Sequence, residues 1–527
     1  MNPPEPGSFS DARPWTVDPD RMRWREGIDA VRADTVARLP ELVRRPRVPP
    51  LGRFTGAGLR IGAALTMWAL RERGRGVSVS RAGLSRRLRG AFEKLGPAYI
   101  KLGQIVSSGA GLFPEELVAE FKSLRDKVPP ESFADVRGVV EAELGRSLEE
   151  VFERFDESCL ASASIAQVHA ARLRTGEEVV VKVQRAAVER LVTKDIRAMS
   201  WIAPFLVGRI PIAALANPPA LVDLFAETIS EELDFRLEAE NMLDIARVLR
   251  DAGSSVVIVP RPHPELVTRR VLVMERLEGF TYEEAEAMRA AGIDTAAVLR
   301  SLLISFLEGA MIYGVFHGDL HGGNLFVMRD GRVALLDFGM TGRMVEKQRL
   351  AFLRMMVTGA MNDVRGQLAA FRDLGALPDD ADFDALIRLL KVDQAPKDPT
   401  LMSGEELVSE IQDLLKGLLA HGARLPKHLM LYVKNMIFFD SAIAQLAPDL
   451  DLFAEVTRIW SYFASQHGER IARELGFDPG LTAIDLTGMK ASLGLSGDVE
   501  TLTHRELIAR REKVRERLEE VGAAPRI

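Results

Sequence analysis

One short stretch of the chain, FHGDLHGGNLFV at 316–327, constrains its fold and chemistry more than any other feature. Asp319 and Asn324 stand five residues apart in it, and Asp337 follows in a D-F-G triplet directly behind the apolar run VALL. The order H-x-D-x-x-x-x-N and then D-F-G is typical of phosphoryl-transfer sites of the protein-kinase type. We therefore predict that Asp319 orients an attacking hydroxyl or water, and that Asn324 and Asp337 hold Mg²⁺ against the phosphates of ATP.

The other half of such a site is expected upstream, on a strand that carries a lysine. The run VVVKVQ places Lys182 between apolar neighbours, which an ammonium tolerates only with a partner. In kinase-type sites that partner is an acid on a following helix, together with the α/β phosphates of ATP. Glu238, in the stretch DFRLEAEN, is the predicted acid.

The segment ahead of the lysine strand aligns with the G-x-G-x-x-G-x-V loop that covers the phosphates in protein kinases. Here alanine stands at each glycine position and the final valine is kept. Each added Cβ restricts positive φ and the approach of the backbone, so we expect a nucleotide pose unlike that of a protein kinase. The residues predicted to line the nucleotide site are Ala161, Ser162, Ala163, Ser164, Ala166, Val168, Lys182 and Glu275.

The region after D-F-G bears on the acceptor. A protein kinase has a long activation segment there and an Arg in its H-R-D motif, whereas this chain has Gly318 at that position and MTGRMVEKQRL running into a predicted helix. Little platform remains for a peptide substrate. The acceptor is expected to be water, a lipid or another small molecule.

The order of elements predicts an α+β, bilobal protein-kinase-like fold that is rich in helices. A chain of 527 residues is long for one core, and a strand-rich segment precedes a mostly helical one. The lysines and the Met-Phe stripe of the stretch at 425–446 are expected to form the surface and core of a helical pack. The expected parts are a loosely ordered, basic Pro/Arg-rich tail (1–56), an N-terminal helical extension (57–130), an N-lobe with a helical insert (131–278), a C-lobe (279–395) and a C-terminal helical region (396–527).

Charge and hydropathy bear on location. The net charge is −6, yet residues 1–100 carry eighteen Arg and one Lys against ten Asp and Glu. Such an arm suits an anionic membrane surface or plain solvation; its arginines are not interleaved with aromatics, so nucleic acid is not expected. A single cysteine and an N-terminus without an apolar stretch predict a cytoplasmic protein, and any membrane contact is expected to be peripheral, at the inner face. The apolar run at 301–316 is predicted to be a buried helix, not a span.

Several motifs together resemble the UbiB/ADCK atypical kinase-like family over roughly residues 92–452. They are KLGQ at 101–104, the alanine-rich loop, EELDFRLEAEN at 231–241, and HGDLHGGN with DFG. The resemblance implies a kinase-like fold with an extra N-terminal helical layer. It also implies ATP-dependent activity that is not protein phosphorylation, and a supporting role in isoprenoid quinone metabolism at membranes.

The resemblance also assigns further site residues. Lys101 and Gln104 match the K-x-G-Q motif, on one face of a helix expected to cross the site. Glu232 and Asp234 match the E-x-D motif and are expected to meet Lys101. The chain departs from many relatives at 107–111, where SSGAG replaces a segment with an Arg and an Asp, and its C-terminal helix at 503–520 is charged.

Three functions remain open from the sequence. The first is an ATPase or a lipid or small-molecule kinase of the UbiB kind. The second is a soluble small-molecule kinase of the aminoglycoside or choline kinase type, which would lack the KLGQ helix. The third is a nucleotide-binding regulator or membrane adaptor without turnover.

Overall fold

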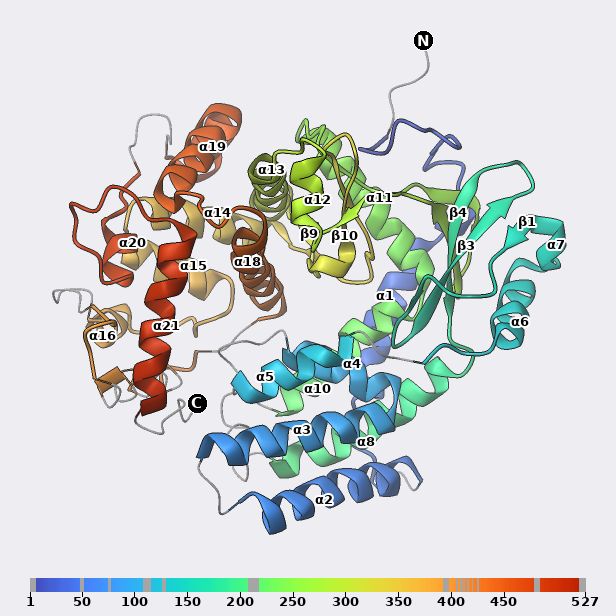
Figure 1. Cartoon of the computed structure of the whole chain (residues 1–527), viewed down its shortest axis with the longest axis horizontal. Helices are drawn as coiled ribbons and strands as arrows, with labels where there is room; N and C mark the ends of the chain where they lie inside the picture. The colour runs from blue at the N-terminus through green and yellow to red at the C-terminus, as the bar shows by residue number, and fades with distance from the viewer. Residues whose placement is uncertain are drawn as a thin grey trace.

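The computed structural model describes residues 6–47, 52–73, 77–107, 115–125, 129–206, 218–391, 398–477 with interruptions between 404 and 425, and 484–520. Within these ranges the chain forms two lobes of mixed α and β structure, with one layer of helices on the N-terminal side and another on the C-terminal side (Figure 1). The predicted helix-rich, bilobal kinase-like α+β fold is confirmed. The departure from relatives at 107–111 lies, except for Ser107, outside the described residues.

The N-lobe is built on a six-stranded sheet of order β1-β3-β4-β7-β6, with β2 paired to β3. The predicted hairpin forms between β3 and β4 and sets Val168 opposite Lys182. Alternate residues of β4 point to opposite faces: Val179, Val181 and Val183 pack beneath α6, while Lys182 faces the cleft. The elements are α6 (Phe133–Leu144), α7 (Leu148–Val151), β1 (Phe152–Phe155), β2 (Ala161–Ser162), β3 (Ala166–Leu173), β4 (Glu178–Gln184), β6 (Pro262–Val267) and β7 (Val271–Glu275).

In the described residues after β4, helices are inserted that link the sheet to the second lobe. They are α8 (Val188–Leu206), α10 (Pro218–Glu232) and α11 (Phe235–Asp251). The side chain of Asp234 caps α11 by accepting a hydrogen bond from the backbone N–H of Arg236, which ends α10 and redirects the chain. Helix α11 is buried over most of its surface and forms the back wall between the lobes (Figure 1).

The N-terminal segment is not the loosely ordered tail that its composition suggests. In the described part, residues 6–47, Phe9, Met22 and Trp24 are buried in the main core. Helix α1 (Ile28–Leu42) packs on α8, α10 and α11, and Arg25 forms an ion pair with Glu240 at 2.6 Å. The expectation of loose order is therefore wrong for these residues, because the Pro- and Arg-rich composition hid a few large apolar anchors.

The helical extension follows and, where the structure describes it, comprises α2 (Arg53–Arg71), α3 (Val77–Leu95), α4 (Pro97–Ser107) and α5 (Glu115–Lys122). Figure 1 shows α2, α3 and α8 stacked below the lobes and α4 with α5 above them, nearest the cleft. The layer packs on α8 and α10, so it is attached to the N-lobe.

The C-lobe carries the catalytic motifs on short strands. One small sheet has the order β5-β11-β10-β8, and β9 pairs with β12. The bounds are β5 (Val257–Ile258), β8 (Phe280–Thr281), α12 (Ala285–Ala290), α13 (Thr295–Glu308), β9 (Val315–His317), η4 (Gly322–Asn324), β10 (Leu325–Val327), β11 (Val333–Leu335), β12 (Thr341–Arg343), α14 (Glu346–Ala360), α15 (Val364–Asp373) and α16 (Phe383–Leu389).

A second helical layer, α18 (Lys427–Leu446), α19 (Leu452–Leu475), α20 (Thr487–Ser492) and α21 (His504–Glu520), covers the C-lobe. Among the described residues one stretch, Thr295–Tyr313, is long and apolar enough to cross a membrane, but 61% of it is buried within the protein. It comprises α13 and a following π-helical turn, and Leu302 and Phe306 pack in the core. This agrees with the predicted buried helix.

Candidate active site

A cavity of about 1180 Å³ lies between the two lobes. It is lined by parts of the chain that are distant in sequence, among them α4, the alanine-rich loop with β4, the α10–α11 junction, the segment 274–284 that joins the lobes, the motifs at 317–339, and α18. Most of the residues predicted for the site line this cavity. The exception is Asp234.

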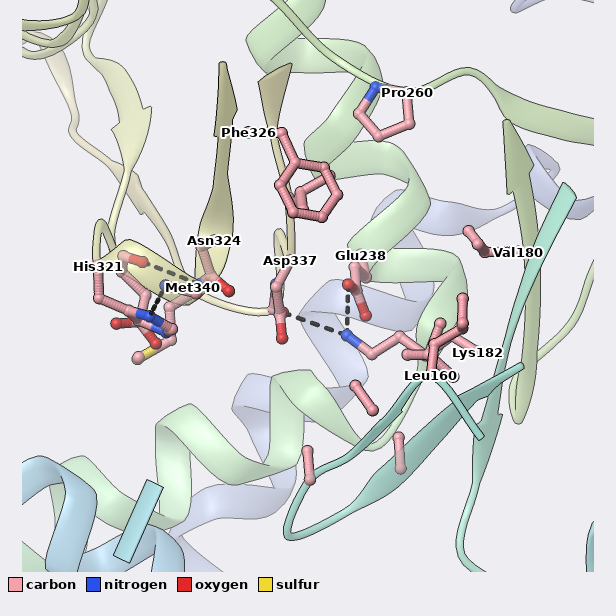
Figure 2. A pocket seen from close by; sticks show the side chains of 18 of the residues that line it. Leu160, Val180, Lys182, Glu238, Pro260, His321, Asn324, Phe326, Asp337 and Met340 are labelled. Atoms are coloured by element: carbon pink, nitrogen blue, oxygen red, sulfur yellow. Dashed lines mark hydrogen bonds and ion pairs between the residues drawn. The ribbon is translucent and has the colours of Figure 1, made fainter. Parts of the chain in front are cut away.

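The centre of the cavity is an ion-pair triad. Lys182 Nζ lies 2.7 Å from Glu238 Oε1 and 3.2 Å from Asp337 Oδ1, as Figure 2 shows. The side chains of Lys182 and Glu238 are 8% and 3% exposed, whereas that of Asp337 is 48% exposed and faces the cavity. The predicted partnership of Lys182 with a helical acid is thus present, and the ammonium bridges that acid to the D-F-G aspartate.

Burial and neighbouring charges have opposite effects on the pKa values of Lys182 and Asp337. Burial by itself lowers the pKa of Lys182, but Asp337 and Glu238 outweigh it and raise the pKa above the ordinary value. Burial would raise the pKa of Asp337, yet Lys182 and Lys101 bring it down to about 2. Lys182 is therefore a cation and Asp337 an anion at neutral pH.

The catalytic loop is fixed to the D-F-G segment through His317. Its Nδ1 accepts from the N–H of Asp319, so Nε2 carries the proton and donates to the carbonyl of Asp337 at 2.9 Å. Gly318 stands where protein kinases have Arg, and the space around it is tight, because a Cβ there would lie 3.0 Å from Met340 O. The chain enters β12 four residues after Asp337, so no long activation segment exists.

Asn324 and Asp337 present oxygen atoms suited to Mg²⁺. Asn324 Nδ2 donates to Asp319 O at 3.0 Å, which turns the amide oxygen away from that contact. Asp337 has a φ of 55°, a strained conformation that aims its carboxylate into the cavity. Within the described residues no group of three or more His, Cys, Asp or Glu could hold a metal on its own. One carboxylate and one amide, completed by phosphate oxygens and water, is the donor set that Mg²⁺ accepts.

Helix α18 adds two residues that the sequence interpretation missed. Lys434 Nζ lies 2.6 Å from Asp319 Oδ1. The fully buried Asn435 accepts a hydrogen bond from Leu320 N at 2.9 Å and donates one to His317 O at 2.7 Å. The expectation that the lysines of this helix lie at the surface is therefore wrong for Lys434.

The K-x-G-Q helix α4 borders the cavity on the side of the helical extension. Lys101 Nζ lies 2.6 Å from Glu232 Oε1, with side chains 11% and 6% exposed, and Gln104 lines the same cavity. Asp234 does not join them: it caps α11 and binds the guanidinium of Arg236 at 2.6 Å. The prediction that both acids of the E-x-D motif meet Lys101 is thus half wrong, because the second acid sits on a helix start and turns away.

The alanine-rich loop lines the cavity as expected, with Ala161, Ser162, Ala163, Ser164, Ala166 and Val168 all at its wall. None of these residues has a positive φ, so the loop has a shape that alanine adopts without strain. Arg185, which the sequence interpretation missed, holds the loop by donating to Ala163 O at 3.1 Å and Ser162 Oγ at 2.9 Å.

Glu275 also lines the cavity, at the position predicted for the nucleotide site. Its carboxylate is held within the protein: Ser10 Oγ donates to Oε1, and the backbone N–H of Arg261 donates to Oε2 at 3.2 Å. Its role toward a nucleotide stays a prediction.

Comparison with known proteins identifies the family of this chain. The model of the ABC1 atypical kinase-like domain matches residues 123–370. The uncharacterized protein Rv0647c of Mycobacterium tuberculosis is 36% identical over 387 residues, which are 71% of this chain and 77% of that protein. The chain belongs to the UbiB/ADCK family of atypical kinases.

Other members of the UbiB/ADCK family are similar over the same extent. The probable protein kinase UbiB of Marinobacter nauticus is 30% identical, covering 70% of this chain and 68% of that protein. The chloroplastic protein ACTIVITY OF BC1 COMPLEX KINASE 1 of Arabidopsis thaliana is 32% identical, over 71% of this chain and 54% of that protein. The solved Rv3197–erythromycin complex of Mycobacterium tuberculosis aligns at 21% identity, covering 66% of this chain and 91% of that chain, with a TM-score of 0.37, too low to argue from.

The family match ends before α18. Lys434 and Asn435 lie beyond residue 370, yet they contact the loop that carries Asp319. The site of this UbiB/ADCK chain is therefore larger than the matched domain.

Proposed function

We propose that this protein binds Mg-ATP in the cavity between its lobes and transfers the γ-phosphoryl group to water or to a small or lipid-like acceptor. The observation that carries the proposal is the convergence of Lys182, Glu238, Asp337 and Asp319, from both lobes, on one cavity. This is the set of groups that phosphoryl transfer requires: a lysine for the phosphates, carboxylate and amide oxygens for the metal, and a carboxylate for the acceptor.

The roles follow from the geometry. Lys182, held by Glu238, binds the α/β phosphates, and the alanine-rich loop covers the nucleotide. Asn324 and Asp337 would hold Mg²⁺, which when bound neutralises phosphate charge. Asp319 accepts the proton of the acceptor hydroxyl as the new P–O bond forms and the bond to the ADP oxygen breaks.

A small acceptor is favoured over a peptide. The Lys101–Glu232 ion pair holds α4 against the cavity, and the chain passes directly from D-F-G into β12 and α14. Both features occupy space that a peptide platform would need. We therefore propose that the acceptor is water or a small group that can enter the cavity.

A lipid or isoprenoid quinone pathway at the inner membrane face is the proposed setting. Relatives carry the name UbiB, and α2 exposes Leu59 and Leu70, about three turns apart on one face, next to Arg60 and Arg71. An apolar stripe flanked by arginines suits peripheral contact with anionic lipid. On this proposal the protein is cytoplasmic and reaches the membrane through its helical extension.

The experiment that tests the activity compares the purified wild type with Asp337→Asn. We expect Mg²⁺-dependent binding of ATP and release of phosphate by the wild type, with and without anionic liposomes and phenolic headgroup analogues, and loss of turnover in the variant. Asp330→Asn, an exposed acid on the turn between β10 and β11, is the matched control and should behave as wild type. Turnover that survives Asp337→Asn would refute the metal-binding role.

Two other outcomes would redirect the proposal. Tight Mg-ATP binding without turnover under all these conditions would favour a nucleotide-binding regulator or adaptor. Full activity after removal of residues 1–110 would favour a soluble small-molecule kinase, because such enzymes have no K-x-G-Q layer.

A further inference from the structure

Lys434 reaches the cavity from the C-terminal helical layer. It lies on α18, and its Nζ is 2.6 Å from Oδ1 of Asp319, the carboxylate that must meet the acceptor. We propose that Lys434 engages the γ-phosphoryl group of the bound nucleotide and that it leaves Asp319 when the nucleotide enters. This inference rests on the proposed function, since it needs a nucleotide in the cavity.

The charges of the site favour this role. Three lysines line the cavity. Lys182 and Lys101 each pair with a buried acid, Glu238 and Glu232, and Lys182 also contacts Asp337. Lys434 pairs with Asp319, the acid expected to meet the acceptor, and its side chain is 11% exposed. A triphosphate carries more negative charge than one carboxylate, so an incoming γ-phosphate competes for this ammonium.

The local structure allows the exchange without movement of the helix. Asn435, the next residue, is fixed to the catalytic loop by hydrogen bonds with His317 O and Leu320 N. The backbone of Lys434 is thereby held beside Asp319, and only its flexible side chain needs to turn. The γ-phosphoryl group must lie between Asp319 and the metal-binding Asp337, which places it within the reach of that side chain.

The test measures affinity, so it does not depend on turnover. The full chain is titrated with fluorescent Mg-ADP and with a non-hydrolysable Mg-ATP analogue. We expect Lys434→Met to weaken binding of the ATP analogue by about tenfold or more, the usual worth of a hydrogen bond to a charged group, and to change ADP affinity less than about twofold. Lys434→Gln, of similar length and still polar, should give the same pattern and serves if the Met variant folds poorly.

Lys427→Met is the matched control. Lys427 lies on the same helix and binds Glu227 of α10 at 2.8 Å, outside the cavity, so its loss should leave both affinities unchanged. Equal loss of both nucleotides in the Lys434 variants, or no loss of either, would overturn the role of Lys434 while leaving the proposed function intact. A wild type that binds neither nucleotide would overturn both.

Discussion

Lys101 and Glu232 join the helical extension to the helices inserted in the N-lobe, two parts of the molecule that are distant in sequence. Their ion pair, 2.6 Å between Nζ and Oε1, fastens the K-x-G-Q helix α4 to the last turn of α10 at the wall of the cavity. Burial by itself lowers the pKa of Lys101, but Glu232 and the nearby Asp319 outweigh this and raise it, so the lysine is charged. Access to the nucleotide site from this side therefore depends on one buried ion pair.

The first prediction concerns this pair. Glu232→Gln leaves the Lys101 ammonium without its carboxylate, and we expect backbone amides of α4 (97–107) to exchange with deuterium several-fold faster. Hydrogen-exchange mass spectrometry measures this directly. Glu120→Gln breaks the partly exposed pair with Arg89, 3.0 Å, within the same layer, and should leave α4 unchanged. Unaltered exchange in Glu232→Gln would mean that packing alone holds α4.

The second prediction concerns Lys182 and Glu238. Lys182→Met leaves a buried carboxylate unpaired, which should lower the free energy of unfolding by about 3 kcal/mol. The double variant Lys182→Met with Glu238→Met should recover most of this stability, yet still bind ATP at least tenfold more weakly than wild type. Urea unfolding and nucleotide titration separate the two effects. A double variant that binds ATP normally would contradict the phosphate-binding role of the lysine.

The third prediction concerns the dependence of stability on pH. The folded-state pKa of Asp319 lies below its unfolded value of about 3.9, so its ion pair stabilises the fold above that pH and is lost as pH falls further. We expect Asp319→Asn to be less stable than wild type at pH 5–7, with a difference that shrinks below about pH 4. Urea titrations at a series of pH values test this. A difference that stays constant down to pH 3 would refute the assignment, and Asp379→Asn, at an exposed site, is the control.

The fourth prediction concerns Asn435. Asn435→Ala leaves Leu320 N and His317 O buried without their partner, at a cost of about 1–3 kcal/mol for each group. We expect the midpoint of thermal unfolding to fall and turnover to fall with it, because the loop bearing Asp319 loses its support. Gln445→Ala, exposed on the same helix, should change neither. Wild-type stability in Asn435→Ala would show that contacts other than those of Asn435 are enough to hold the loop.

The sequence was sufficient to predict the parts of the site that follow local rules. A lysine in an apolar strand needs an acid, and Glu238 was predicted because kinase-type sites place that acid on a following helix. The bilobal fold was predicted from the order of strand-like and helical segments. These predictions succeed because residue types and their order along the chain are enough to recognise the motifs.

The misses depend on contacts across the fold. A lysine on an amphipathic helix is expected at the solvated surface, as it was for Lys434. The packing of α18 on the loop at 317–324 brings this lysine to Asp319 instead. Asp234 carries the right charge, but it caps α11 and pairs with Arg236 instead of lining the cavity. The N-terminal segment was misjudged because three buried aromatic and Met side chains outweigh its average composition.

The pair of hydrogen bonds made by Asn435 has a practical consequence for anyone who works with this protein. The matched family domain ends at residue 370, but the loop that bears Asp319 is hydrogen-bonded to α18, which begins only at residue 427. A fragment trimmed to residues 123–370 would keep the H-x-D-x-x-x-x-N and D-F-G motifs but lose the K-x-G-Q helix and α18, both of which line the cavity. Chimeras and minimal versions should therefore keep the downstream helices attached.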